Sequence, residues 1–304
     1  MSDPWYILGA GAIGSLLACR LQKAGLDVHL LRRAGSELSA QSSLVLEEDH
    51  REQQLHFAQH PVAAIAPGGV KRLLICTKAY DVKPAFVDVL PGLAEDAVVL
   101  LLHNGMGTLA EIQPLAPQLQ IAAGTTTEGA YWKSPGILAG SGRGETRIGL
   151  PGSPEIVAGF TPLLETDTGF LWEADIEQSL WRKLLINCAI NPLTALHGCV
   201  NGELLHNPEL AAELHALCSE LTPVAQALGY QQLASRLEQE VRSVAKATGH
   251  NRSSMLQDHQ AGRPTEIDYI TGYLLQQVRR LGLDCPINER LLAELKPLTG
   301  GEAN

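Results

Sequence analysis

The residues whose types and spacing best suit chemistry are Lys183, Asn187 and Asn191, which lie within an otherwise apolar stretch over residues 181–196. Side chains four residues apart stack along one face of a helix, so these three form a polar stripe. Such a stripe is either a solvent-exposed face or the lining of an internal cleft. We favour the cleft, because a solvent face usually carries several charged side chains, whereas this stripe has one ammonium group and two neutral amides.

Composition limits what can hold this stripe in place. The chain has 304 residues, which is enough for two domains, and its hydrophobic content of 45% supports a substantial core. A formal net charge of −10 argues against a nucleic-acid partner, whose phosphates favour a basic surface. There is no targeting leader and no apolar run long enough to span a bilayer. We therefore expect a cytoplasmic protein with no membrane partner.

The cysteines show no pattern of a disulfide framework or of a zinc site. They are scattered along the chain without a Cys-x-x-Cys pair, and most of them lie in apolar segments. The six are Cys19, Cys76, Cys188, Cys199, Cys218 and Cys285. We expect reduced, mostly buried thiols and no bound metal ion.

The chain begins with a nucleotide-binding pattern. A buried-strand pattern over residues 5–8 leads into Gly9-Ala10-Gly11-Ala12-Ile13-Gly14, an apolar helix follows, and residues 28–31 are the next predicted strand. In this context G-x-G-x-x-G is typical of a turn that binds the pyrophosphate of a dinucleotide at a helix N-terminus. Gly9 permits the turn, Gly11 lets the pyrophosphate approach the backbone, and Gly14 lets helix and strand pack closely.

The end of the second strand indicates which dinucleotide binds. NAD sites usually place an Asp or Glu there to bind the ribose 2′-hydroxyl, but this chain has Arg32 and Arg33. A guanidinium group can pair bidentately with a 2′-phosphate. We therefore predict NADP(H) with Arg32 as a contact, while Arg33 is as readily explained as an exposed strand-end residue.

Lys78 and Asn104 are further candidates because each follows a buried strand. In a doubly wound sheet, ligands bind outside the carboxyl ends of the strands. Lys78 suits a phosphate, and Asn104 suits a ribose, a nicotinamide or a polar group of a substrate. Both residues have an ordinary loop position as the alternative interpretation.

The fold expected is α/β, with an N-terminal Rossmann-type domain over residues 1–172 and an all-helical C-terminal domain over 173–304. In the first domain we expect an edge hairpin or loop region over 37–60 with a charged turn at 47–52, strands that finish the sheet antiparallel over 121–150, a helix over 155–164 and an edge strand at 170–172. In the second we expect helices over 177–196, 207–228, 232–248 and 288–295, one that starts with a Ser254 capping box, and a long one that opens at Thr265.

The chain resembles the ketopantoate reductases over nearly its whole length. The matching segments are Gly9–Gly14, Lys78-Ala79, His103-Asn104-Gly105-Met106-Gly107, the run from Trp181-Arg182-Lys183 to Asn191-Pro192-Leu193-Thr194-Ala195, Ser253-Ser254-Met255-Leu256-Gln257-Asp258, and Thr265-Glu266-Ile267-Asp268-Tyr269-Ile270. The last three are the more specific, because the glycine pattern occurs in many dehydrogenases.

The resemblance implies an NADPH-dependent reduction of 2-dehydropantoate to pantoate in pantothenate and coenzyme A biosynthesis, with a hydride delivered to the C2 ketone. It also implies a role for each matching residue. Lys183 would be the proton donor and Glu266 its acidic partner, Arg32 and Lys78 would hold the 2′-phosphate, and the substrate and nicotinamide would contact Asn104, Asn187, Asn191, Asn251 and Ser254.

The residues themselves agree in part with these implied roles. Lys183 is the only cation on its stripe and is therefore the natural acid. Plain structural explanations remain for the others: an acidic residue such as Glu266 is favourable in a first helical turn, Ser254 can act as an N-cap, and the stripe amides can bind backbone.

Two other functions stay open at this point. One is a dehydrogenase of the same plan that acts on another 2-keto acid or on an imine, and the other is an NADP-binding sensor without turnover. An acid beside the nicotinamide weighs against the sensor, which has no need of one. In the favoured interpretation the partner is a small 2-keto acid, and the chain is a monomer or a homodimer.

Overall fold

The computed structural model describes residues 3–33, 43–48 and 51–296. The chain divides into two compact units. Unit 1 contains the residues up to 103 together with 108–179, and unit 2 contains 104–107 together with the residues from 180 onward. Unit 1 has a hydrophobic core on each face of its sheet, and unit 2 has a core of its own.

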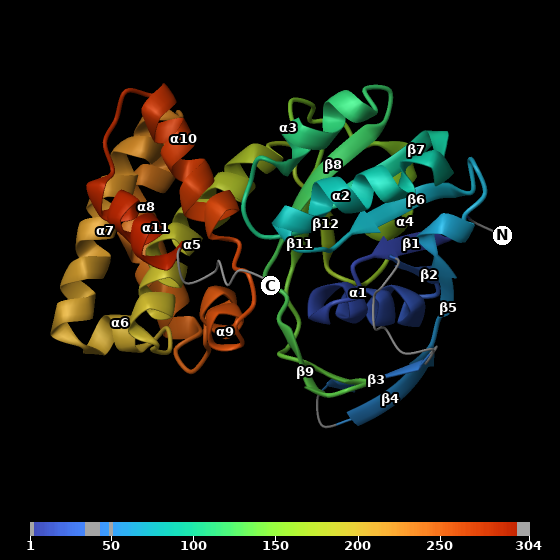
Figure 1. Cartoon of the computed structure of the whole chain (residues 1–304), viewed down its shortest axis with the longest axis horizontal. Coiled ribbons are helices and arrows are strands. Elements are labelled where there is room, and N and C mark those ends of the chain that lie inside the picture. The colour runs from blue at the N-terminus through green and yellow to red at the C-terminus, as the bar shows by residue number, and fades with distance from the viewer. Residues whose placement is uncertain (1–2, 34–42, 49–50, 297–304) are drawn as a thin grey trace, which may run out of the picture. The chain divides into compact units, whose positions relative to one another are not determined.

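Unit 1 is built on an eight-stranded sheet with the order β12-β11-β8-β7-β6-β1-β2-β5 (Figure 1). The strands are β1 (Trp5–Leu8), β2 (Val28–Arg32), β5 (Ala58–Pro61), β6 (Val70–Ile75), β7 (Leu93–Leu101), β8 (Gln120–Thr126), β11 (Thr146–Gly149) and β12 (Phe170–Trp172). The six strands from β5 to β8 run parallel, and β11 pairs antiparallel with β8. The predicted α/β class, the antiparallel finish at β11 and the edge strand at 170–172 are confirmed, but the strands predicted over 129–139 to finish this sheet lie in another one.

Helices cover both faces of this sheet. On one face α1 (Ala12–Lys23), η4 (Ala158–Phe160) and α4 (Thr161–Leu164) share a core, and on the other α2 (Ala79–Val89) and α3 (Thr108–Ile112) share a second. The predicted helix over 155–164 is wrong in its first turn. Residues 155–157 are not helical, and the indole of Trp172 donates to the carbonyl of Pro154 (3.0 Å), which holds this segment against the sheet edge.

A second sheet of four strands was not expected. Its order is β4 (Arg51–His56), β3 (Ser43–Glu48), β10 (Ile137–Gly140) and β9 (Ala130–Ser134). The predicted hairpin exists as β3 and β4, but it pairs with β10 rather than with the main sheet. Of the charged turn predicted at 47–52, Glu47, Glu48, Arg51 and Glu52 lie in paired strands, whereas residues 49–50, like 37–42, lie outside the described part.

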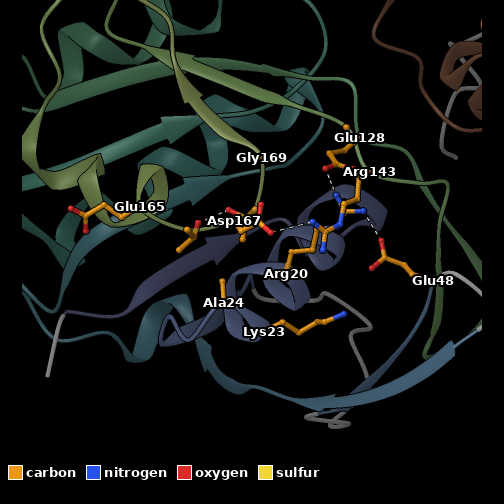
Figure 2. Close-up of a pocket in the computed structure, with 12 residues that line it drawn as sticks. Arg20, Lys23, Ala24, Glu48, Glu128, Arg143, Glu165, Asp167 and Gly169 are labelled. Atoms are coloured by element: carbon orange, nitrogen blue, oxygen red, sulfur yellow. Dashed lines mark hydrogen bonds and ion pairs between the residues drawn. The ribbon is translucent and has the colours of Figure 1, made fainter.

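Arg20 fastens α1 to the second sheet. Its guanidinium group is almost fully buried, pairs with Glu48 of β3 and with Glu128, and donates to the carbonyl of Gly142 (2.9 Å). The Arg20, Glu48 and Glu128 side chains line a cleft of about 590 Å³ together with the exposed Arg143 and Asp167 (Figure 2). No candidate site residue lines this cleft, and the buried Arg20 guanidinium group pairs with both Glu48 and Glu128, so we assign it a structural role.

Among the described residues of unit 2 all regular secondary structure is helical, which confirms the all-helical C-terminal region. The helices are α5 (Ile176–His197), α6 (Glu203–His206), α7 (Pro208–Ala227), α8 (Gln231–Ala247), α9 (Ser254–Gln260), α10 (Tyr273–Arg280) and α11 (Pro286–Leu295). The Asn207 side chain caps α7 by accepting from the backbone N–H of Glu209 (2.9 Å). The short α6 was not predicted.

Two predicted helix starts are wrong. Ser253, not Ser254, caps α9, because its Oγ accepts from the N–H of Leu256 (3.1 Å). Thr265 lies before the last long helix, and the carbonyl of Glu266 accepts the first N–H groups, those of Tyr269 and Ile270 (both 3.0 Å). The chain then makes a π-helical turn, η5 (Asp268–Gly272), before α10.

The described residues contain neither a membrane-spanning helix nor a cluster of metal-binding side chains. None of their helices combines the length and the apolar character needed to cross a membrane. Nor do three or more His, Cys, Asp or Glu side chains gather there in a way that could hold a metal ion.

Candidate functional site

The polar stripe lies on a sheltered part of α5. Asn191 is 7% exposed, and Lys183 and Asn187 are partly buried, while apolar side chains around them are fully buried. The neighbouring Arg182 differs, because it is exposed and pairs with Glu240. The stripe is therefore not a solvent-exposed face of the kind that carries Arg182.

Lys183 has an electrostatic partner in Glu266. Burial lowers the pKa of the Lys183 ammonium from 10.5 to about 8, and the negative charge of Glu266 opposes that shift. Glu266 itself is only 4% exposed. A lysine in this state is protonated at neutral pH and releases its proton more readily than an exposed lysine, which suits a general acid.

The loop after β7 brings Asn104 to Glu266. The Asn104 Nδ2 donates to Oε2 of Glu266 (3.3 Å), and the N–H of Met106 donates to the carbonyl of Tyr269 (2.9 Å). Gly105 has φ +82°, and a Cβ there would lie 2.5 Å from that same carbonyl oxygen, so only glycine fits. Asn104 thus lies beside Glu266. Only the resemblance suggested a shared site for them, because no local pattern links two residues that are 162 positions apart.

The remaining substrate candidates lie at the start of α9. Asn251 is exposed and Ser254 is partly buried. The carbonyl of Asn251 accepts from the N–H of Asn201 (3.0 Å), which fixes this segment to the turn after α5. We found no signal in the sequence for this backbone pairing, which depends on the tertiary fold.

The glycine turn in unit 1 has the geometry of a dinucleotide cradle. Gly9 has φ +101°, and a Cβ there would lie 2.6 Å from the backbone nitrogen of Thr77. A Cβ on Gly14 would overlap the carbonyl oxygen of Gly9, whereas one on Gly11 would meet no atom within 4 Å. The turn therefore packs tightly against the sheet at Gly9 and Gly14. At Gly11, which lies between Ala10 and Ala12-Ile13 at the start of α1, there is open space, and this fits a bound pyrophosphate.

The two arginines at the end of β2 differ in their surroundings. Arg33 pairs with Asp88 (2.8 Å) and Asp81 (3.5 Å) of α2. Arg32 is partly buried and is the last residue of β2, and Lys78 immediately precedes α2. The positions of Arg32 at the end of a strand and of Lys78 at the start of a helix are those expected for phosphate contacts, and both roles stay predictions.

The cysteine side chains are poorly suited to chemistry. All six are free thiols, and all but Cys76 are buried. Burial raises the pKa of Cys19, Cys76, Cys218 and Cys285 to about 12 and raises that of Cys188 and Cys199 as well. Since the thiolate is the reactive form, these thiols are unreactive at neutral pH.

We therefore expect that a thiol-blocking reagent applied to the folded protein leaves turnover nearly unchanged. The measurement is the rate of NADPH consumption before and after modification, with mass spectrometry to count the modified thiols. Complete inactivation by a single modified cysteine, prevented by substrate, would contradict this prediction.

A parallel sheet with a dinucleotide-binding glycine turn, followed by a helical unit that carries a lysine of lowered pKa, defines a two-domain nicotinamide-dependent oxidoreductase. The sequence profile of the ketopantoate reductase PanE/ApbA family matches residues 5–152, and its C-terminal profile matches 175–299. The chain belongs to the ketopantoate reductase PanE/ApbA family.

Individual relatives agree with this assignment. The chain is 37% identical over 297 residues to the 2-dehydropantoate 2-reductase of Vibrio cholerae, with 96% of each chain covered. The crystal structure of a PanE/ApbA family ketopantoate reductase from Ralstonia eutropha JMP134 matches with a TM-score of 0.84 at 27% identity, covering 97% of this chain and 98% of that one. A D-mandelate dehydrogenase with NADH and anilino(oxo)acetate has the same fold, with a TM-score of 0.86 at 21% identity and coverage of 97% and 98%.

Proposed function

We propose that this protein is an enzyme that reduces 2-dehydropantoate to pantoate with NADPH. The observation that carries the proposal is the pairing of Lys183, whose pKa is lowered to about 8, with the buried Glu266 in a chain of this family. NADPH, when bound, supplies the hydride that reaches the C2 ketone. The direct test is the loss of NADPH absorbance when 2-dehydropantoate is added to the purified protein.

The proton that completes the reduction of the ketone comes from Lys183 in unit 2. As the ketone is reduced, negative charge develops on its oxygen, and the Lys183 ammonium donates a proton to that atom. Glu266 keeps the ammonium charged until then by opposing the effect of burial. Asn104 donates to Glu266 and so holds the carboxylate in place, in addition to its proposed contact with nicotinamide or substrate.

Neutral donors and acceptors complete the proposed substrate site. Asn187 and Asn191 extend from the same face of α5 as Lys183, and Asn251 and Ser254 lie at the start of α9. Amide and hydroxyl groups can bind the carboxylate and the hydroxyl of a small 2-keto acid without changing the charge near Lys183.

The proposed contacts with the phosphates of the cofactor lie in unit 1, whereas Asn104, the proposed contact with its ribose or nicotinamide, lies in unit 2. The open turn Gly9–Gly14 would hold the pyrophosphate, and Arg32 and Lys78 would hold the 2′-phosphate. We further propose a cytoplasmic protein, monomeric or homodimeric, without a nucleic-acid partner, in keeping with its net charge of −10.

The second candidate is a dehydrogenase for another 2-keto acid. The observation in its favour is the shared fold of the D-mandelate dehydrogenase, whose structure contains NADH and anilino(oxo)acetate. The ratio of kcat/KM for 2-dehydropantoate to that for other 2-keto acids decides between the two. A sensor without turnover fits the site less well, because it needs neither Lys183 nor Glu266 in this state.

The role of Glu266 predicts a shift in the pH profile. Glu266→Gln keeps an oxygen that can accept from Asn104 but removes the charge that raises the pKa of Lys183. Lysine donates only when protonated, so activity falls as the pH rises through its pKa. The alkaline limb of kcat, expected near pH 8 in the parent, should therefore move to lower pH in the variant.

Asp268→Asn is the matched control for this measurement. Asp268 lies two residues from Glu266 but is exposed and pairs with Lys296 (2.9 Å), so the limb should stay in place. If the limb does not move in Glu266→Gln either, Lys183 keeps its proposed role, but Glu266 is not its electrostatic partner.

A further inference from the structure

Thr194 is a fully buried polar residue on the helix that carries the catalytic lysine. Its hydroxyl donates to the Oγ of Ser253 (2.7 Å) and also lies 3.0 Å from the carbonyl oxygens of Ile190 and Asn191. Within α5 a valine of similar shape would fill this apolar position without the cost of burying a hydroxyl group. The two carbonyl oxygens belong to the helix of Thr194 itself, so the bond to Ser253 is the contact by which this buried hydroxyl reaches another segment.

That other segment contains two of the proposed substrate contacts. Ser253 is 6% exposed and lies next to Ser254 and two residues from Asn251. Its Oγ also accepts from the N–H of Leu256 (3.1 Å) and so sets the first turn of α9. The bond from Thr194 therefore reaches the atom that determines where Ser254 is placed.

The backbone gives the segment a second attachment to the same region. The N–H of Gly202 donates to the carbonyl of Gly249 (3.0 Å), and the N–H of Asn201 donates to that of Asn251 (3.0 Å). A Cβ on Gly202 would lie 2.9 Å from the Gly249 carbonyl oxygen, so the backbone segments around Gly202 and Gly249 are in close contact. Residues 249–253 are thus fastened to the end of α5 and to the turn that follows it.

We propose that Thr194 is a positioning residue for the substrate. By holding Ser253, it fixes Asn251 and Ser254 relative to Lys183, Asn187 and Asn191, which all extend from α5. The side chains that bind the keto acid and the lysine that protonates it are then all held by α5. The position of these side chains relative to one another determines how well the substrate binds. This inference rests on the proposed function, since the ligand of Asn251 and Ser254 is taken to be the 2-keto acid.

The test compares Thr194→Val, which removes the hydroxyl at nearly constant volume, with Thr194→Ser, which keeps it. Thr194→Val should raise the KM for 2-dehydropantoate by about three- to tenfold, the usual effect of one hydrogen bond, with little change in kcat or in the KM for NADPH. It should also speed hydrogen–deuterium exchange in residues 251–257. Thr194→Ser should restore the parental KM and exchange.

The matched control is Thr222→Val in α7. Its hydroxyl donates only to the carbonyl of Cys218 (2.8 Å) among the described contacts, and the variant should lower Tm without changing KM. The double variant Thr194→Val with Ser253→Ala should raise KM no more than Ser253→Ala alone, because both changes remove one interaction. Ser253→Ala by itself is the substitute if Thr194→Val does not fold.

Two results overturn the proposal. One is a parental KM in Thr194→Val with unchanged exchange, and the other is faster exchange with an unchanged KM, which would mean that the segment is fastened only for stability. A parent that turns over no 2-keto acid refutes the proposed function and with it the substrate role of Thr194. The exchange measurement then still decides whether Thr194 holds this segment.

Discussion

Lys183→Ala should lower kcat for 2-dehydropantoate by about 10²–10⁴-fold, the range expected for loss of a positioned general acid. The lysine acts mainly while charge develops on the ketone oxygen, so its loss should affect the transition state more than the binding of either ligand. NADPH affinity should persist, because the proposed contacts with the pyrophosphate and the 2′-phosphate lie in unit 1 and Lys183 lies in unit 2. Steady-state kinetics and a titration of NADPH fluorescence measure these two quantities.

The adjacent residue supplies the control for this experiment. Arg182 is also a cation of α5, but it is exposed and pairs with Glu240, so Arg182→Ala should keep nearly parental kcat. A Lys183→Ala enzyme with near-parental kcat would falsify the proposed proton donor.

Arg32→Asp should remove most of the preference for NADPH over NADH. The substitution deletes a charged hydrogen-bond donor and places a negative charge near the 2′-phosphate. A hydrogen bond to a charged group contributes about 1.5–3 kcal/mol, so the NADPH/NADH ratio of kcat/KM should fall by at least roughly tenfold. Both cofactors are measured at a fixed concentration of 2-dehydropantoate.

Arg32→Ala and Arg33→Ala form a matched pair for the same assay. Asp88 and Asp81 already hold the Arg33 guanidinium, so Arg33→Ala should change the ratio less than Arg32→Ala does. An unchanged ratio in Arg32→Asp would show that the assignment of Arg32 to the 2′-phosphate is wrong. A larger change in Arg33→Ala would assign that phosphate to Arg33 instead.

The features that sequence reasoning predicted well are those determined by neighbouring residues. The β1 strand, the glycine turn and α1 follow from a short apolar run, three glycines at fixed spacing and an apolar helix, all within residues 5–23. The polar stripe of α5 follows in the same way from a period of four within one helix. In each case the residues that determine the element lie within the element itself, so the sequence pattern is sufficient to predict it.

The features that were missed or wrong depend on distant partners or on near-equivalent neighbours. The parallel pairing of β3 with β10 joins residues 45–47 to 137–139, and no local pattern indicates such a partner. Ser253 and Ser254 are both good cap residues, and the bond from Thr194 accompanies the choice of Ser253. The contact between Asn104 and Glu266 has the same long-range character.

The loop formed by residues 104–107 has a consequence for how the chain can be divided. Because these residues pack within unit 2, that unit is not a continuous stretch of chain and cannot be excised whole. A fragment that starts at Leu180 would lack the Asn104 amide bound to Glu266 and the Met106 N–H bound to Tyr269. During synthesis the ribosome releases this loop long before residues 266–269 emerge, so the helical unit can finish packing only against a segment made much earlier.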